Sequence, residues 1–265
     1  MKKQKNKKVI YYSDPINDDF AGTKIKTTIV DENFKYIHKN FLWKACSFTI
    51  YYIIALPLVW FFCRVLLRIK IVNKKAIKKL KKQQYFMYGN HTGFYDAFIP
   101  NLISVPRFNK IIVSPDTVSI KGLKNIVQML GAVPLPTNDS GMKNYLQAVD
   151  YFQKSKNNIT VYPEAHIWPY YTGVRPFKET SFSYPIRYNA PVVAFYTAYT
   201  KPKGLFKHFR KANITVYISD PIYPDLTKDK KSAKKELRDK VYDFMKETSE
   251  KYSDYNVYEY IQTEK

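Results

Sequence analysis

The amino-acid sequence predicts an α/β fold in which a central mixed sheet is flanked by helices and preceded by an apolar N-terminal helical segment. Two observations predict it. Short β-branched or aromatic runs alternate along most of the chain with segments whose apolar residues recur at helical spacing, and this alternation is typical of a sheet covered by helices. Ahead of these segments, the stretch from Ala45 to Cys63 contains no charged residue.

The elements of the sheet and its helices follow one another along the chain. The runs that predict strands are Tyr85–Gly89, Lys110–Ser114, Asn158–Tyr162, Pro191–Tyr199 and Ala212–Ile218. The segments that predict helices are Asp96–Ile103, Leu123–Leu130 (ended by Gly131), Met142–Lys154, and a C-terminal helix whose apolar face runs from Ala233 to Tyr252. In each helical segment the apolar residues share one face, which is expected to pack on the sheet.

The uncharged stretch has the length and the edges of a membrane anchor. It can cover a hydrocarbon core of about 30 Å, and Trp43 and Trp60 near its ends suit the headgroup region. Both flanks are basic, so the positive-inside rule selects no orientation, and Pro57 is expected to break or kink a helix. We therefore favour a bent, re-entrant or interfacial anchor with both flanks on one side. A straight span and a buried core helix remain as alternatives.

These features divide the chain into three parts. Residues 1–40 form a basic N-terminal segment, residues 41–72 a membrane-anchoring or re-entrant helical segment, and residues 73–265 one globular α/β domain. No internal repeat and no Gly/Ser linker argues for a further division.

The charge and the cysteine content narrow the partners. With 44 Lys+Arg against 22 Asp+Glu the formal net charge is +22, which suits nucleic acid or an anionic membrane surface. The lysine-rich runs at 1–8, 74–82 and 228–240 could equally be solvated surface faces. Between the two anionic partners, the apolar stretch favours a membrane surface, so we expect no nucleic-acid partner. Cys46 and Cys63 exclude a disulfide scaffold and indicate a reducing compartment. The four histidines are scattered without metal-ligand spacing, so we expect no metal site.

One short block carries residues suited to acid–base chemistry. In Tyr88–Phe98 (YGNHTGFYDAF), His91 precedes Asp96 by five residues. On a continuous helix this spacing would turn the two side chains apart. They can meet if His91 lies in the loop that leaves the strand and Asp96 lies in the first turn of the next helix, with Gly93 allowing the turn. A carboxylate on one ring nitrogen would leave the other free to take a proton from a hydroxyl. Taken alone, the spacing could arise by chance.

Three further sequence blocks follow in a fixed order, and together with them the His91–Asp96 spacing indicates a functional site. NHTGFYD (Asn90–Asp96) is followed by GAVPLPT (Gly131–Thr137), YPEAH (Tyr162–His166) and APVVAF (Ala190–Phe195). In order and spacing these blocks resemble those of the glycerolipid acyltransferase family typified by lysophosphatidic acid acyltransferases. That family carries an N-H-x4-D block, a G-x-[IV]-[FP]-[IVL]-x-R block, an F-P-E-G-T block and a later apolar-P-V block. The resemblance implies a glycerol-3-phosphate acyltransferase-like fold for residues 73–265.

The resemblance also implies roles for single residues. His91 would be the general base for an acceptor hydroxyl, Asp96 would orient it, and Glu164 would help to hold the polar head of the acceptor. The block that begins at Gly131 would line the site. The acyl group would come from acyl-CoA or acyl carrier protein and pass directly to the hydroxyl, with no cofactor and no metal.

The chain departs from the family pattern at three positions. The arginine that ends the second block and grips the acceptor's phosphate in the family is Thr137 here, and the Gly-Thr pair of the third block is Ala165 and His166. Arg175 or Lys178 could supply the missing cation, and His166 could contact the acceptor. An Arg fork and a Lys point charge are not equivalent. Either the phosphate is held from elsewhere or the acceptor is not a simple lysophosphatidate.

The sequence therefore predicts a membrane-associated O-acyltransferase that uses a His/Asp pair to move a fatty acyl chain from a thioester to a lysophospholipid, most simply lysophosphatidate. Two alternatives remain: the same chemistry on a different acceptor, and a non-catalytic acyltransferase-like lipid-binding protein. Frequent Lys, Asn, Ile, Tyr and Phe indicate an AT-rich bacterial genome, and hence the cytoplasmic face of a bacterial cell membrane.

Overall fold

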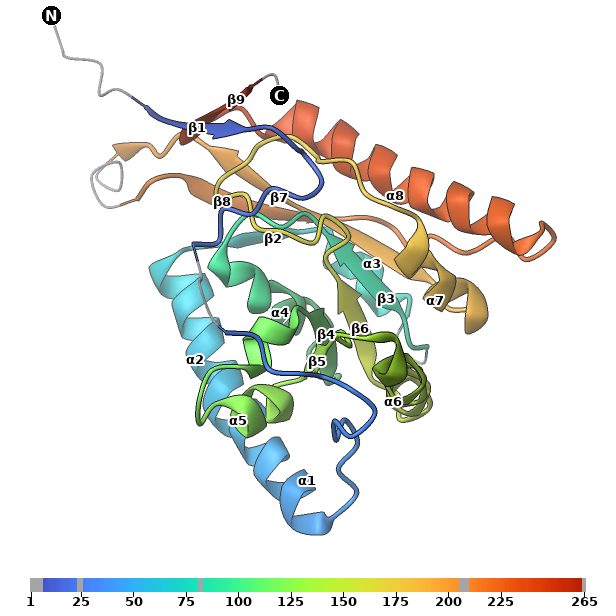
Figure 1. Ribbon diagram of the computed structural model, residues 1–265. Helices are drawn as coiled ribbons and strands as arrows, with labels where there is room; N and C mark the ends of the chain where they lie inside the picture. The colour runs from blue at the N-terminus through green and yellow to red at the C-terminus, as the bar shows by residue number, and fades with distance from the viewer. Residues whose placement is uncertain (1–6, 23–25, 81–82, 205–209, 264–265) are drawn as a thin grey trace, which may run out of the picture.

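The computed structural model describes residues 7–22, 26–80, 83–204 and 210–263. Its centre is a mixed seven-stranded sheet in the order β2-β8-β7-β3-β6-β4-β5, seen in Figure 1. The strands are β2 (Lys70–Val72), β3 (Phe86–Gly89), β4 (Asn109–Val113), β5 (Ala132–Pro134), β6 (Asn158–Val161), β7 (Val192–Thr200) and β8 (Asn213–Ile218). All neighbours pair in parallel except β7 and β8, which are antiparallel. The predicted α/β class, with a mixed central sheet, is confirmed.

Helices cover both faces of this sheet. α6 (Met142–Lys154) and α8 (Lys230–Tyr252) pack on one face, while α3 (Lys75–Lys78), α4 (Ile99–Ser104) and the end of the N-terminal apolar helix pack on the other. Two further short helices are α5 (Lys124–Met129) and α7 (Ser183–Arg187). Single 3₁₀ turns lie at Phe94–Ala97, Pro115–Val118, Asp139–Gly141 and Thr180–Phe182.

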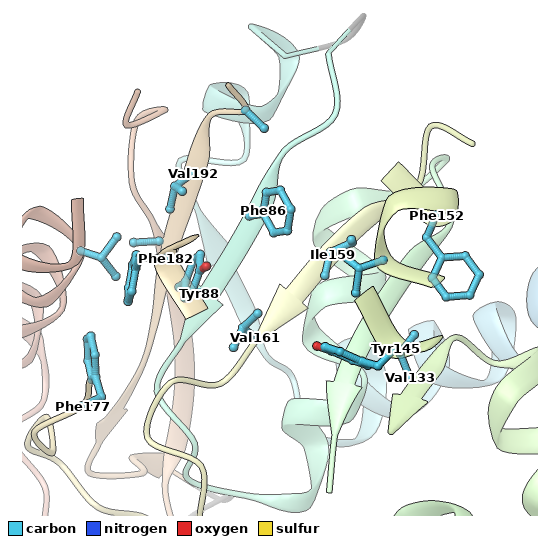
Figure 2. Close-up of a cluster of buried hydrophobic side chains, with 14 of the residues drawn as sticks. Phe86, Tyr88, Val133, Tyr145, Phe152, Ile159, Val161, Phe177, Phe182 and Val192 are labelled. Carbon is cyan, nitrogen blue, oxygen red and sulfur yellow. The ribbon is translucent and has the colours of Figure 1, made fainter. Parts of the chain in front are cut away.

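The core follows the alternation of side chains along each strand. In β3, Phe86 and Tyr88 point toward α6 and α8, whereas Met87 points to the α4 side. Figure 2 shows Phe86, Tyr88, Ile159, Val161 and Val192 from three adjacent strands facing one cluster, which α6 closes with Tyr145 and Phe152. Because both faces are covered, the central strands β3, β6 and β7 are buried along nearly their whole length. Their few polar residues, such as Asn158 and Thr160 of β6, are buried as well.

Gly131 occupies the one position of the second sequence block where the backbone requires a glycine. It joins α5 to β5 with φ +107°, and a Cβ there would lie 2.3 Å from the Asn109 carbonyl oxygen of β4. Any side chain would push β5 away from β4. The structure therefore gives Gly131 a part in positioning the edge strand that leads to Thr137.

The apolar stretch forms one continuous helical run, Phe41–Leu66, of 26 residues. It comprises α1 (Phe41–Phe48), a π-helical turn (Thr49–Ala55), α2 (Leu56–Phe61) and a second π turn (Phe62–Leu66). Pro57 does not interrupt it, so the expected break is wrong. The π turn before Pro57 lets the Leu56 N–H bond to the Tyr51 carbonyl, and Pro57 falls at the start of α2, where an N–H is not needed. Only 11% of its most apolar window is buried, so the alternative of a buried core helix is also wrong.

Both ends of this helix are fastened to the same globular body. Before it, Val30, Phe34 and Tyr36 are buried in the core cluster of α6, and after it Ile69 is buried on the other face of the sheet. Figure 1 shows the helix running along one side of the domain, past α4 and α5. It therefore lies against the domain rather than projecting from it.

The described part of residues 1–40 is also integrated into the fold. β1 (Lys8–Tyr12) pairs in parallel with β9 (Tyr258–Gln262), so these two strands from opposite ends of the described chain lie side by side. Met1–Asn6, Lys81, Lys82 and His208, which belong to the sequence features named above, lie outside the described residues.

Candidate active site

The predicted catalytic residues lie at the carboxyl edge of the sheet. β3 ends at Gly89 and leads into Asn90 and His91, while β6 ends at Val161 and leads to Glu164. β3 and β6 are parallel neighbours, so the loops that leave them begin side by side. Open α/β sheets bind their ligands at this edge.

Asn90 fastens the end of β3 to β7 directly before His91. Its side chain is fully buried. Nδ2 donates to the Thr197 carbonyl at 3.2 Å, and Oδ1 accepts the Thr197 N–H at 2.7 Å. These two bonds continue the β3–β7 ladder through a side chain, so the backbone that carries His91 is fixed. The sequence contained Asn90 in the motif but gave it no role.

His91 and Asp96 meet as the loop-and-turn arrangement predicts. His91 Nδ1 lies 3.0 Å from Asp96 Oδ2, and the same oxygen accepts the backbone N–H groups of Thr92 at 2.6 Å and Gly93 at 2.9 Å. A carboxylate oxygen can only accept, so Nδ1 carries a proton, and in the neutral ring the lone pair is then on Nε2. Asp96 is fully buried and the His91 side chain is 18% exposed. The pair therefore offers an accessible base on a buried, oriented carboxylate.

The turn that brings them together depends on Gly93. Asp96 lies in the 3₁₀ turn Phe94–Ala97 rather than in a regular helix, and its carboxylate folds back over the start of that turn. A Cβ on Gly93 would lie 2.6 Å from the ring of Tyr95. Tyr95 cannot give way easily, because its hydroxyl bonds to Tyr199 in the buried core. A glycine at position 93 thus allows the Tyr95 ring to pack directly against the backbone of the turn.

Glu164 reaches from β6 to the backbone of His91. Its Oε2 accepts the His91 N–H at 3.1 Å, and its Oε1 accepts the Arg175 N–H at 3.0 Å. The Arg175 guanidinium lies 3.3 Å from Oε2, and both side chains are 1% exposed. Burial raises the pKa of Glu164, while the Arg175 charge and the two N–H groups act in the opposite direction. The carboxylate is thus engaged by protein donors on both oxygens.

The Arg175 side chain is held by contacts with the segment that follows Glu164. Its guanidinium donates to the His166 carbonyl and lies 4.9 Å from the ring centre of Trp168. Trp168 in turn donates its backbone N–H to the His91 carbonyl at 3.1 Å. Arg175 therefore supports the walls of the site from behind, and it does not present its charge at the surface.

Aromatic residues that sequence reasoning missed complete the surroundings of His91. The His91 ring stacks on Tyr162, with centroids 4.4 Å apart and planes at 20°. The Tyr162 hydroxyl donates to the Asp96 carbonyl. On the other side, Thr92 Oγ1 and Tyr199 Oη are 2.7 Å apart. Burial raises the pKa of Tyr162 and Tyr199 well above the usual value, so both remain neutral. The tyrosine in YPEAH was the signal that could have indicated the stacking.

The remaining predicted residues are more dispersed. Thr137 is exposed, and its Oγ1 accepts the Val30 N–H at 3.0 Å. Lys178 is exposed. His166 is 37% exposed, with Nδ1 3.6 Å from Asp19 Oδ2. Ala165 has φ +63°, a conformation that favours glycine, which the family carries here. The structure joins His91, Asp96, Glu164 and Arg175 in one network and gives Thr137, Lys178 and His166 no bond to it through their side chains among the described residues.

An apolar cavity of about 260 Å³ lies beside the turn that carries Asp96. It opens between the apolar helix, α4, α5 and β4. Its lining includes Tyr51, Leu56, Val59, Ala97, Phe98, Ile111 and Val113. Ala97 and Phe98 directly follow Asp96, so the cavity borders the end of the turn that carries Asp96. Its walls suit a hydrocarbon chain. Among the described residues no group of three or more His, Cys, Asp or Glu side chains could hold a metal ion.

The fold and this site define an acyltransferase. A family model described as Acyltransferase matches residues 68–198, which include His91, Asp96 and Glu164. The chain belongs to this family and is an O-acyltransferase, so the resemblance seen in the sequence is confirmed.

A solved structure supports the fold. The crystal structure of the 1-acyl-sn-glycerophosphate (LPA) acyltransferase PlsC from Thermotoga maritima is similar, with a TM-score of 0.54 and 15% sequence identity. The similarity covers 80% of this chain and 96% of that one. Among curated proteins no match was found.

Proposed function

We propose that this enzyme transfers a fatty acyl chain from an acyl thioester to a hydroxyl of a lysophospholipid, with His91 as general base. The observation that carries the proposal is the 3.0 Å bond from His91 Nδ1 to the buried Asp96 carboxylate, which leaves Nε2 to accept a proton. The acceptor hydroxyl gives its proton to Nε2 as its oxygen attacks the thioester carbonyl. The C–S bond then breaks, an ester forms, and the imidazolium returns the proton to the leaving thiolate.

The acyl chain is assigned to the apolar cavity beside Asp96. Its lining is mostly hydrocarbon and aromatic, with Asn101 and Thr117 as its polar residues. Because it includes Ala97 and Phe98, which directly follow Asp96, a chain inside it would present its carbonyl on the side of His91. Acyl-CoA and acyl carrier protein both carry such a thioester, and the activated bond removes the need for an enzyme nucleophile.

Lysophosphatidate is the simplest acceptor, because the solved PlsC structure is named for that activity. A second acceptor is favoured by one observation: the position of the family's phosphate-binding arginine is Thr137, whose hydroxyl bonds to Val30. Arg175 is held by Glu164 and buried, which leaves exposed Lys178 as the predicted replacement cation. A lysophospholipid with a phosphodiester headgroup carries less negative charge than one with a phosphomonoester. It would therefore need fewer cations in the binding site.

We place the protein on the cytoplasmic face of the cell membrane, with the helix Phe41–Leu66 in the plane of the interface. At about 1.5 Å per residue this helix is about 39 Å long, long enough to span, but both of its ends are packed into one globular domain. A span would require those ends on opposite sides of the bilayer. Its outward side is strongly apolar, with exposed Phe41, Leu42, Phe48, Ile53, Leu58, Phe61 and Leu66, as an interfacial helix requires.

The test is an acyl-transfer assay with the full-length protein in mixed micelles. Acyl-CoA and acyl carrier protein thioesters are each offered with lysophosphatidate, lysophosphatidylglycerol and lysophosphatidylcholine. The proposal expects the diacyl product from at least one anionic acceptor, in proportion to released thiol. Thiol release without a diacyl product would refute it by showing hydrolysis of the thioester instead of transfer. No reaction with any pair would also refute it and would leave the non-catalytic lipid-binding alternative.

A further inference from the structure

A second cavity, separate from the proposed acyl site, lies between the apolar helix and the α4 region. It has a volume of about 560 Å³ and is also lined by Ile71 of β2 and by Lys74. It shares Leu56 with the acyl cavity and otherwise has different walls. None of the residues placed in the His91 network lines it.

Two cations, Arg64 and Lys74, line this cavity. Arg64 Nη1 donates to the Ile69 carbonyl at 2.6 Å, and Lys74 Nζ donates to the Leu102 carbonyl at 2.7 Å. The lining contains no Asp or Glu, and neither cation has a carboxylate partner among the described residues. Burial, and then the charge of Arg64, lower the pKa of Lys74. The fold thus holds two like charges close enough to repel each other, and the described part of the chain supplies no counter-charge.

The rest of the cavity is apolar and is aligned along the helix. Tyr52, Leu56, Trp60 and Arg64 recur every four residues, so they share one face. At about 1.5 Å per residue this face is about 18 Å long. Leu102 and Val105 of the α4 region form the facing wall. Trp60 is 54% exposed one turn before Arg64, where an indole would lie at the headgroup level of a membrane.

We propose that this cavity binds an anionic phospholipid, with its phosphate between Arg64 and Lys74 and one acyl chain along Leu56 toward Tyr52. The two unopposed cations select a net negative headgroup over a zwitterionic one, since no acid is present to pair with a choline or ethanolamine. The apolar wall selects a lipid over a free phosphate ion. The site is separate from His91, and the proposal stands whether or not the acceptor is a lysophospholipid.

The test measures quenching of tryptophan fluorescence by a brominated lipid. Full-length protein in nonionic detergent micelles is titrated with phosphatidylglycerol that carries brominated acyl chains. Saturable quenching is expected, and Trp60→Phe removes it because Trp60 lines the cavity. Arg64→Gln with Lys74→Gln weakens the apparent affinity at least ten-fold. Lys78→Gln, the same charge change at an exposed lysine one turn along α3, leaves it within two-fold.

Two further measurements keep the result unambiguous. Glutamine retains a donor for the Ile69 and Leu102 carbonyls, and the thermal unfolding midpoint verifies the fold. Arg64→Lys is expected to retain most of the affinity. Acyl transfer in detergent is expected to be unchanged in the glutamine variants, which separates this site from the catalytic one. Equal quenching by brominated phosphatidylcholine, equal loss in Lys78→Gln, or full displacement by millimolar inorganic phosphate would overturn the proposal.

Discussion

Glu164 Oε2 accepts the backbone N–H of His91 at 3.1 Å, although the two residues are 73 positions apart. This bond joins the Pro-Glu block to the histidine block. The other carboxylate oxygen accepts the Arg175 N–H, and both charged side chains are 1% exposed. Glu164 is thus placed to hold the loop that carries His91. This role differs from the contact with the acceptor that the family resemblance implies.

Replacing Glu164 by Gln separates these two roles. If Glu164 positions His91, Glu164→Gln lowers kcat by about ten-fold or more with little change in the KM for the acceptor. It also leaves buried Arg175 without a countercharge, which costs about 3 kcal/mol of folding free energy. Steady-state kinetics and urea unfolding measure both effects. Glu179, a partly exposed acid 4.0 Å from Lys234, is replaced in the same way as control. A raised acceptor KM at unchanged kcat would restore the acceptor-contact role.

The turn at Gly93 gives a second prediction. A Cβ there meets the ring of Tyr95 at 2.6 Å, so Gly93→Ala must displace either the ring or the Asp96 carboxylate that accepts the Gly93 N–H. We expect kcat to fall by about ten-fold or more and folding free energy by about 1–3 kcal/mol, as for an overpacked core. Gly204→Ala is a control for added bulk, since nothing lies within 4 Å of a Cβ at that position, although its φ of +65° is itself strained. Full activity in Gly93→Ala would show that the turn is more tolerant than its packing indicates.

These results show which parts of the site the sequence could reveal. His91 and Asp96 were predictable because they stand in an N-H-x4-D block that three further blocks follow in the order of the family, and because a loop and a turn after a strand can bring the two side chains together. The bonds of Glu164 to the protein interior were not predictable, because its partner Arg175 comes from an irregular loop without periodicity. The continuity of the helix through Pro57 depends on a π turn that no residue pattern announces. The pairing of β1 with β9 joins short terminal strands whose contact is set by the tertiary fold.

Lys110 predicts a dependence of stability on pH. Its ammonium lies 4.6 Å and 4.5 Å from the ring centres of Phe108 and Phe152, and burial lowers its pKa to about 8. The unfolded value is about 10.4. Below pH 8 both states are charged and the fold bears the cost of burying the charge. As pH rises from 8 to about 10.4 only the unfolded state stays protonated, so this cost is relieved.

Lys110→Met is therefore expected to stabilise the protein by about 2 kcal/mol near pH 7, after allowing for the lost cation–π contacts. The gain should shrink through pH 8 and be absent near pH 10.4. Urea unfolding at several pH values measures it, relative to Lys143→Met at an exposed lysine of α6. A gain that is constant with pH would contradict the assignment of the cost to burial of the charge.

Thr137 allows the acceptor to be tested directly. Thr137→Arg restores the family's cation and loses the bond from the Val30 N–H, which costs about 1 kcal/mol. If the family's phosphate position is conserved in this fold, the KM for lysophosphatidate falls by about ten-fold relative to that for lysophosphatidylcholine, as a charge-assisted hydrogen bond provides. Thr137→Gln is the uncharged control. An unchanged KM ratio would place the acceptor's phosphate elsewhere.

The central claim is that His91 Nε2 takes the proton of the acceptor hydroxyl. The most direct measurement is the rate of acyl transfer by His91→Gln, with the thermal unfolding midpoint as a check on the fold. Because general-base catalysis contributes about 10²–10⁴-fold, the account predicts a loss of at least about 100-fold with a near-native midpoint. A folded His91→Gln variant that keeps more than a tenth of the wild-type rate would contradict it.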